Sequence, residues 1–236
     1  MGSTVNAAEI KVLSTHAVYE VLGELGPQFE RTAGRRLSVG YDPANAIKRQ
    51  IGEGAAFDVA IVTRAVIDNL AGQGKIAPDT CIDIARCGLG LSVRKGAPKP
   101  DIGTVEAFKR TLLAAKSVVR SKVGTSGPYF EKLLERLGIA EAMRGKIALG
   151  PSGRVAVLVA KGEAEMAVQQ ISELLPVTGT QFAGPFPPEL QLYTVFSVGI
   201  GSACKDKESA QAFIDALTAP SAAPLFKIHG LEPILR

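Results

Sequence analysis

Three observations predict an α/β fold made of two doubly wound lobes. Short apolar runs alternate with stretches whose apolar residues recur at helical spacing, which is the strand–helix rhythm of a parallel sheet. The rhythm stops near Ala85 and starts again near Ser117. Two long extended runs, Ala85–Arg94 and Leu190–Ile200, lie where the chain would leave the first lobe and return to it. Long strands at such joins are expected of a hinge between two lobes.

The first lobe is predicted to open with three strand–helix pairs. The helix expected over Ala17–Thr32, for example, has apolar residues at Val18, Val21, Leu22, Leu25 and Phe29. The expected strands are 10–13, 37–40 and 57–62, and the expected helices are 17–32, 45–52 and 65–72. Turn-forming residues separate these segments, as βαβ units require.

The second lobe is predicted to repeat this pattern. Its expected helices are 105–112, 129–137 and 155–161, and its expected strands are 117–120, 146–149 and 166–169. Two helices, 207–218 and 221–228, then complete the chain. We therefore assign residues 8–84 and 199–236 to lobe I, which is discontinuous, and residues 85–198 to lobe II with its hinge crossovers. One continuous sheet would fit the same strand count.

Composition excludes several classes of protein. The net charge of +4 is mild and its lysines and arginines are scattered without interleaved aromatic residues, so a nucleic-acid partner is not expected. No run of eighteen apolar residues exists, so no membrane span is expected. Cys81, Cys87 and Cys204 are too few and too far apart for a metal site. No phosphate loop, nucleophile elbow or zinc motif occurs, and we expect no cofactor.

Four predicted strands run into short turns rich in glycine and hydroxyl side chains, just before a helix. These turns are Ser14–Ala17, Tyr41–Asn45, Gly124–Gly127 and Gly150–Arg154. Each places free N–H groups at the positive end of a helix dipole, which suits an anion. In open α/β sheets ligands bind beyond the carboxyl ends of the strands. The same residues are also ordinary helix caps, so one such turn alone is weak evidence.

Individual side chains in these turns have two interpretations each. His16 would donate to an anion or transfer a proton, or it is a partly buried turn residue. Arg154 would clamp a carboxylate, or it is an exposed residue of a first helical turn. Gln169–Glu173 follows an apolar strand with paired amides that would bracket a carboxylate, or it is a polar strand end. The predicted ligand-binding residues are Ser14, Thr15, His16, Asn45, Thr125, Ser126, Gly127, Arg154 and Gln170.

The pattern resembles the molybdate-type extracellular solute-binding proteins of ABC transporters. The likeness runs from Ile10 to Pro233 and rests on several motifs: Val12–Ser14, Gln50–Val59, Gly124–Tyr129 with Leu134–Gly138, Val159–Glu165, and Ala212–Leu217 through His229–Leu231. It implies a class II periplasmic-binding-protein fold and an anion held by neutral donors, with Ser14, Thr125 and Ser126 at matching positions.

Two segments depart from that family. Asp42–Asn45 stands where molybdate binders carry a hydroxyl pair, and Gln169–Glu173 replaces a tyrosine-bearing segment. The expected ligand is therefore a small anion, either an oxyanion or a small carboxylate.

The resemblance implies a periplasmic binding protein that delivers this anion to an ABC-type permease. Small residues around Asn6–Glu9 are compatible with a removed signal peptide, and equally with a natural cytoplasmic start. The alternative is a cytoplasmic isomerase or lyase of a small carboxylic acid on the same fold. Titratable side chains near the candidate turns favour it, and His16 and Glu173 would then be the catalytic residues.

Overall fold

The computed structural model describes residues 9–150 and 153–234, and its strands form two separate sheets. The chain divides into two units. Unit 1 runs to Ala85 and continues over Val195–Ile228 and from Glu232, while unit 2 comprises Arg86–Thr194 and His229–Leu231. The predicted α/β class with two units is confirmed, and a single continuous sheet is wrong for the described strands.

Unit 1 is built on a mixed sheet in the order β11-β4-β10-β3-β1-β2. Its strands are β1 (Glu9–Ser14), β2 (Arg36–Tyr41), β3 (Val59–Thr63), β4 (Ile82–Cys87), β10 (Thr194–Ile200) and β11 (Glu232–Pro233). β1 pairs in parallel with β2 and β3, so the carboxyl ends of these three strands share one edge. β10 is antiparallel to β3, because it enters the sheet at that edge after the chain has passed through unit 2.

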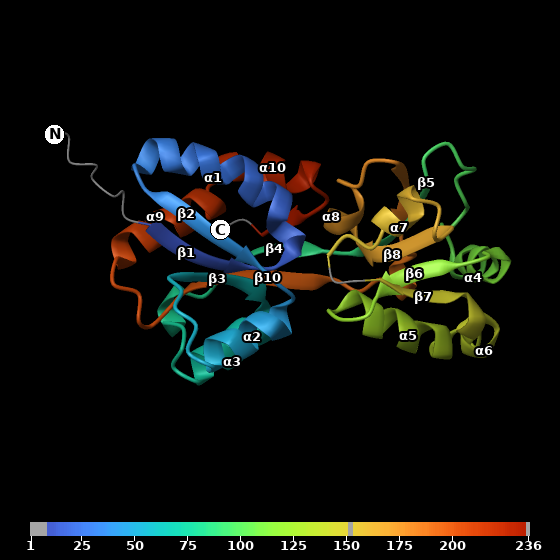
Figure 1. Ribbon diagram of the computed structural model, residues 1–236, viewed down its shortest axis with the longest axis horizontal. Helices are drawn as coiled ribbons and strands as arrows, with labels where there is room; N and C mark the ends of the chain where they lie inside the picture. Colours follow the sequence, from blue (N-terminus) through green and yellow to red (C-terminus); the bar gives the residue numbers. More distant parts are fainter. Residues whose placement is uncertain (1–8, 151–152, 235–236) are drawn as a thin grey trace. The chain divides into compact units, whose positions relative to one another are not determined.

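Helices cover both faces of the unit 1 sheet (Figure 1). On one face lie α1 (Tyr19–Ala33) and α9 (Lys207–Thr218), which meet through Phe29 and Phe213 with ring centroids 5.2 Å apart. On the other lie α2 (Ala44–Gly52) and α3 (Arg64–Gly72), whose apolar stripes pack on β3. α10 (Ala223–Ile228) follows α9.

Unit 2 has a five-stranded sheet in the order β7-β6-β8-β5-β9 among the described residues. Its strands are β5 (Leu89–Arg94), β6 (Val118–Ser121), β7 (Ile147–Gly150), β8 (Met166–Gln170) and β9 (Thr180–Pro185). β6 is parallel to β7 and β8, whereas β5 is antiparallel to β8 and β9.

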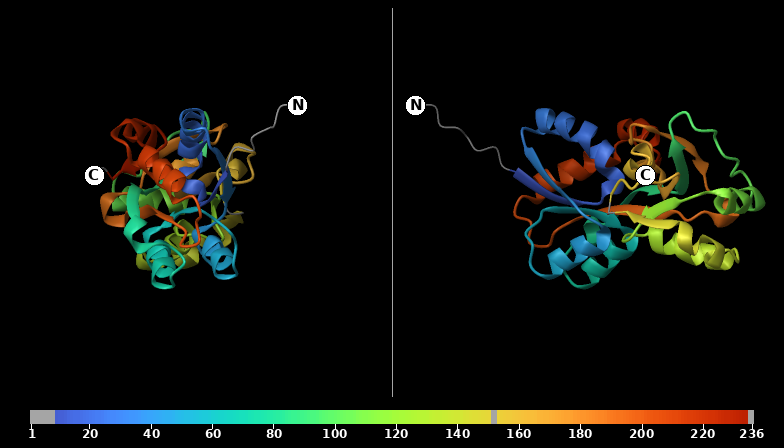
Figure 2. Two further views of the ribbon diagram at one scale, coloured as in Figure 1. Left: turned by 90° about the vertical axis from the view of Figure 1, so that its left-hand side faces the viewer. Right: turned by 45° about the vertical axis from the view of Figure 1, so that its right-hand side comes forward.

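The unit 2 sheet is also covered on both faces, as Figures 1 and 2 show. Neighbouring residues of β6 point to opposite sides, so Val118 belongs to the core under α4 and α5, and Val119 to the core under α7. The helices are α4 (Val105–Ala114), α5 (Ser126–Arg136), α6 (Ala140–Met143), α7 (Val157–Ala160) and α8 (Ile171–Leu174).

Both long extended runs are interrupted. Ala85–Arg94 is divided between β4 and β5 at Gly88, and in the second run β10 begins only at Thr194. At the start of β5, the Gln191 amide oxygen accepts the Leu89 N–H at 2.6 Å and the amide nitrogen donates to the Leu89 carbonyl at 3.0 Å. The Leu89 carbonyl also accepts the Phe186 N–H at 3.0 Å, so Gln191 adds a side-chain contact to the first residue of β5.

The segment His229–Leu231 belongs to unit 2, although the sequence placed it in lobe I. Gly230 has φ +75°, and a Cβ added there would lie 2.7 Å from the Ile171 Cγ2 atom. Its carbonyl accepts from the Cys87 thiol at 3.4 Å. Glycine is therefore required at this contact, which attaches the segment to α8.

Candidate functional site

Each unit collects polar side chains at the carboxyl ends of its parallel strands. In unit 1, β1 ends at Ser14 and is followed by Thr15 and a short 3₁₀ turn, His16–Val18. Ser14 is fully buried, and its hydroxyl donates to the Thr15 carbonyl at 3.2 Å. The Ser14 carbonyl in turn accepts the Asp42 N–H at 3.1 Å, which ties this turn to the end of β2.

Thr15 carries a polar atom that no other group satisfies. Its side-chain oxygen is buried and has no hydrogen-bond partner among the described residues, and it does not cap the turn that follows. An unpaired buried hydroxyl costs about 1–3 kcal/mol. At the carboxyl end of a central strand, such an atom is a strong candidate for a ligand contact.

His16 belongs to an aromatic cluster at the same end of the sheet. Its ring centroid lies 6.0 Å from that of Tyr41, and Tyr19 lies 4.7 Å from Tyr41. Burial, together with neighbouring Tyr19 and Glu20, raises the pKa of Tyr41 to about 12. The Tyr41 hydroxyl therefore stays protonated and can only act as a neutral donor or acceptor near neutral pH.

The second predicted turn of unit 1 begins α2. Pro43 precedes this helix without a capping side chain, and Asn45 is exposed in its first turn. Asp42 is held by the Gln50 amide, which donates to its Oδ2 at 2.7 Å. This turn therefore presents backbone N–H groups and the Asn45 amide beside one carboxylate.

In unit 2 the end of β6 meets the start of α5. Thr125 precedes this helix, is exposed, and makes no side-chain cap, while Ser126 is 4% exposed. The N–H groups of the first turn are therefore not capped by Thr125 and remain suited to an anion.

Gly127 has a packing role that the sequence did not indicate. An added Cβ would lie 2.0 Å from the Ser121 carbonyl oxygen. The same carbonyl accepts from Arg120, a buried side chain that also pairs with Glu131 at 2.9 Å. Close contact between α5 and β6 thus accounts for a glycine here, and ligand binding by Gly127 stays a prediction.

The end of β8 carries a polar side chain, Gln169, with several hydrogen-bond partners. The Gln169 amide oxygen accepts the Val155 N–H at 3.1 Å, and its nitrogen donates to the Gly153 carbonyl and hydrogen-bonds Glu173. Arg154 lies between these two backbone contacts. Pro151 and Ser152 of the same predicted turn lie outside the described residues.

Glu173 has the most unusual carboxyl of this set. The residue keeps part of its surface accessible, but burial of the carboxyl raises its pKa from 4.5 to about 8. The hydrogen bond from Gln169 and the positive charge of Arg154 both oppose this rise. A carboxyl with such a pKa holds and releases a proton near neutral pH.

Two further side chains belong to the same part of unit 2. Gln170, at the end of β8, is 6% exposed. The Cys87 thiol contacts the Ser172 hydroxyl at 3.5 Å, and burial raises its pKa to about 11, so it is not a reactive thiolate. Cys81 and Cys204 are also free thiols.

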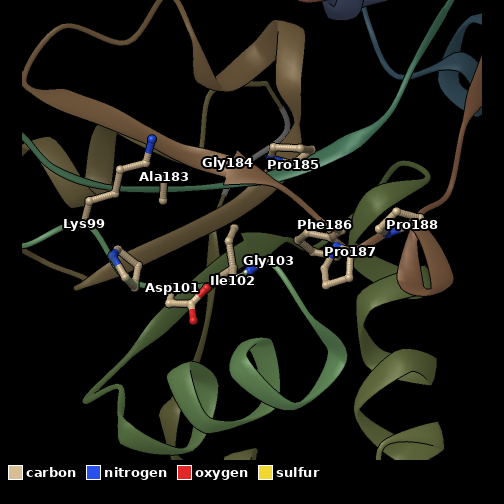
Figure 3. A pocket seen from close by; sticks show the side chains of 11 residues that line it. Lys99, Asp101, Ile102, Gly103, Ala183, Gly184, Pro185, Phe186, Pro187 and Pro188 are labelled. Carbon is tan, nitrogen blue, oxygen red and sulfur yellow. Dashed lines mark hydrogen bonds between the residues drawn. The ribbon is translucent and has the colours of Figure 1, made fainter.

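Other cavities lie away from these strand ends. One of about 430 Å³ in unit 2 lies between the loop before α4 and the edge strand β9, and Figure 3 shows Lys99 and Asp101 among its mostly apolar and proline-rich lining. Within 9–150 and 153–234, no cluster of three metal-ligating side chains occurs, and no helix is long and apolar enough to cross a membrane.

Two α/β units with donor groups at their strand ends define the class of two-lobed solute-binding proteins. A family model described as bacterial extracellular solute-binding protein matches residues 10–232, and the chain belongs to this family. An aconitate isomerase from a Pseudomonas species is 31% identical over 231 residues, covering 95% of this chain and 88% of that protein.

Molybdate-binding proteins are also similar, which confirms the resemblance seen in the sequence. The molybdate-binding protein ModA of Azotobacter vinelandii is 25% identical over 233 residues, covering 95% of this chain and 90% of that protein. A solved periplasmic molybdate-binding protein from the same organism has a TM-score of 0.79 at 19% identity, covering 96% of this chain and 99% of that one. The substrate-binding domain of a putative molybdenum ABC transporter from Clostridium difficile has a TM-score of 0.74 at 16% sequence identity. This match covers 97% of this chain and 100% of that one. These structural matches establish the fold.

Sequence reasoning found the turns but missed several contacts within them. The missed contacts join residues that lie 11 to 22 positions apart in the sequence. They are the Tyr19–Tyr41 packing, the Arg120–Glu131 ion pair and the hydrogen bond from Val155 to Gln169. The polar pair at the end of an otherwise apolar β8 was the available signal for Gln169.

Proposed function

We propose that this protein binds a small polycarboxylate of the aconitate type and shifts a proton along it, as an isomerase. The observation that carries the proposal is Glu173, a carboxyl with a raised pKa that is hydrogen-bonded to Gln169 and lies in the electric field of Arg154. Near neutral pH a carboxyl with this pKa is mostly protonated, and it can both donate a hydrogen bond to an anion and exchange its proton with the ligand. The 31% identity to an aconitate isomerase supports the same assignment.

The proposed reaction needs no cofactor or redox step. Aconitate has a methylene group next to a carbon–carbon double bond, and each end of this unit carries a carboxylate. A base removes a proton from the methylene carbon, the double bond moves by one position, and the conjugate acid returns the proton to the other end. No atoms are gained or lost, and rotation before the proton returns exchanges the cis and trans forms.

Particular side chains are suited to proton transfer and to carboxylate binding in this reaction. Glu173 takes and returns the proton, which its pKa of about 8 permits near neutral pH. Arg154 binds a substrate carboxylate, since a guanidinium matches its two oxygens. In unit 1, taken by itself, the candidate neutral donors are the Ser14 turn and Thr15, whose hydroxyl has no partner among the described residues, and His16 is a second candidate for proton transfer.

An isotope experiment tests the proposal. Incubating the protein with cis-aconitate in D₂O should yield trans-aconitate carrying deuterium at carbon, as followed by proton NMR. Glu173→Gln should abolish exchange and isomerisation while trans-aconitate still binds. Binding of cis-aconitate without formation of trans-aconitate by the native protein would refute the isomerase.

Capture for transport is the second candidate, and the family match favours it. In this case the protein would work in the periplasm after removal of a signal peptide and deliver an oxyanion or small carboxylate to an ABC-type permease. A thermal-shift panel of cis- and trans-aconitate, citrate, molybdate and sulfate separates the candidates. A ligand at a hundred times its Kd adds about 2.7 kcal/mol to the stability. Stabilisation by molybdate or sulfate alone, without isomerisation of aconitate, would favour transport.

A further inference from the structure

Gln169 uses its whole side-chain amide in contacts within unit 2. Its oxygen accepts the Val155 N–H at 3.1 Å, and its nitrogen donates to the Gly153 carbonyl. A further hydrogen bond joins it to Glu173. The residue itself is 1% exposed, at the end of β8. Because one oxygen and one NH₂ group serve these three partners, the amide can adopt only one orientation.

The two backbone contacts lie on either side of Arg154. Gly153 supplies the carbonyl before this residue, and Val155 supplies the N–H after it. Gly153 has φ +88°, and Val155 is fully buried against β7. Because hydrogen bonds hold the backbone on both sides of Arg154, the direction in which its side chain leaves the backbone is fixed. A long, flexible arginine side chain in a free loop lacks this constraint.

We propose that Gln169 is a positioning residue, which fixes the Gly153–Val155 segment and thereby places Arg154 beside the Glu173 carboxyl for binding a substrate carboxylate. The ligand named in this inference rests on the proposed function. The placement of Arg154 by Gln169 is independent of it. Gln169 touches no reacting atom in this scheme. It acts through Arg154 and through its own bond to Glu173.

Among the described residues, Arg154 and Cys87 interact electrostatically with Glu173. Arg154 comes from the segment before α7, and Cys87 comes from the end of β4, where its thiol meets Ser172. Cys87 stays neutral because burial raises its pKa to about 11. The pKa of Glu173 is raised first by burial and lowered by Gln169 and Arg154, so the test compares the shift that Arg154→Ala causes in two backgrounds.

A double-mutant cycle on affinity tests the proposal. Gln169→Met keeps the length of the side chain and removes all of its hydrogen bonds. Calorimetry with trans-aconitate should show ten- to a hundredfold weaker binding in Gln169→Met, and less than a twofold further loss when the substitution is made in an Arg154→Ala protein. Equal losses in both backgrounds, or native affinity in the single variant, would overturn the proposal.

A second cycle needs no ligand and separates this inference from the proposed function. The pKa of Glu173 is followed by carbon-13 NMR of its carboxyl, assigned with Glu173→Gln. Arg154→Ala should raise this pKa in the native background and leave it unchanged in the Gln169→Met background. Equal shifts would mean that Gln169 does not place Arg154, even if aconitate binds. If aconitate does not bind, but the change in the Glu173 pKa on Arg154→Ala differs between the two backgrounds as expected, the proposed isomerase is refuted. The positioning role of Gln169 is then retained.

Gln181→Met is the matched control for both cycles. Gln181 also donates from its amide to a backbone carbonyl of unit 2, that of Ala97 at 2.6 Å, but from β9. Its substitution removes a similar hydrogen bond without touching Arg154. Affinity and the titration of Glu173 should both stay native. Should Gln169→Met fail to fold, Gln169→Asn keeps a neutral amide on a shorter side chain and serves in the same cycles.

Discussion

The backbone N–H of Thr15 donates to the Ile61 carbonyl at 3.0 Å, a bond that continues the pairing of β1 with β3 past the last strand residue. The backbone of Thr15 is therefore fixed, although its side-chain oxygen has no hydrogen-bond partner within residues 9–150 and 153–234. A fixed backbone with an unsatisfied hydroxyl is typical of a donor prepared for a ligand, because stability is given up for a contact that only the complex makes.

Thr15→Val should therefore separate stability from binding. Removing an unpaired buried hydroxyl should leave the free energy of unfolding unchanged or raise it by about 1 kcal/mol. Affinity for trans-aconitate should fall about tenfold, the loss of one hydrogen bond to a charged group. Urea denaturation and calorimetry measure the two quantities.

Thr194→Val is the control for Thr15. Its side-chain oxygen is likewise buried and unpartnered, but it lies at the start of β10 rather than at the end of a parallel strand. The same gain in stability should appear without any change in affinity. If Thr15→Val keeps native affinity, its hydroxyl is only a packing defect.

Glu173 should make the protein less stable as the pH rises. Its pKa is about 8 in the folded protein and near 4.5 when the side chain is solvated, so between these values the unfolded chain releases a proton that the folded protein keeps. Stability from this group is thus full below about pH 4.5 and is lost progressively up to about pH 8, with a slope of at most about 1.4 kcal/mol per pH unit.

Glu173→Gln isolates that contribution. The variant lacks the titrating group, so its melting temperature relative to the native protein should increase from pH 5 to pH 8 and then stay level. Glu163→Gln, which changes an exposed carboxylate, provides the baseline. A difference that does not vary with pH would show that the Glu173 carboxyl titrates normally.

Gly127→Ala should destabilise the protein by about 1–3 kcal/mol. The new Cβ would lie 2.0 Å from the Ser121 carbonyl oxygen, so α5 has to move away from β6. Gly23→Ala is the opposite case, since nothing lies within 4 Å of the added atom in the middle of α1. It should stabilise by up to about 1 kcal/mol because alanine favours a helix. Thermal unfolding of both variants decides whether the glycine at 127 serves packing.

Local patterns in the sequence were sufficient for most elements of the fold. Apolar residues at helical spacing predicted α1 over Ala17–Thr32, and the structure has it over Tyr19–Ala33 after a 3₁₀ turn. β9 (Thr180–Pro185) was missed because Gly184 and Pro185 are typical of a loop. An edge strand tolerates both residues. The late start of β10 was missed because Gln191 hydrogen-bonds Leu89 through its side chain, a long-range contact that local sequence does not specify.

The candidate site could be predicted only as a set of turns. Residue types at strand ends indicated Ser14, Thr125 and Gln170, since such positions are set by local sequence. The connections among Gln169, Arg154 and Glu173 depend on packing of β8, α8 and the segment before α7, which no local pattern specifies. The raised pKa of Glu173 follows from burial, a property of the whole unit.

Ser126→Ala tests the start of α5 as an anion contact. The side chain is 4% exposed, and Thr125 before it makes no cap, so the hydroxyl and the first-turn N–H groups are available to a carboxylate. The loss of one charge-assisted hydrogen bond should weaken trans-aconitate binding about ten- to a hundredfold. Stability without ligand should change by less than about 0.5 kcal/mol.

Ser209→Ala should give the reverse pattern. The Ser209 hydroxyl donates to Asp206 at 2.8 Å and accepts from Arg35 at 2.9 Å, at the start of α9. Its loss should lower the free energy of unfolding by about 1 kcal/mol and leave affinity native, because these partners hold the helix start rather than a ligand. Calorimetry and urea denaturation on the two serine variants then compare two helix starts directly. If Ser126→Ala behaves like Ser209→Ala, losing stability but not affinity, the start of α5 is a structural cap and Ser126 does not contact the ligand.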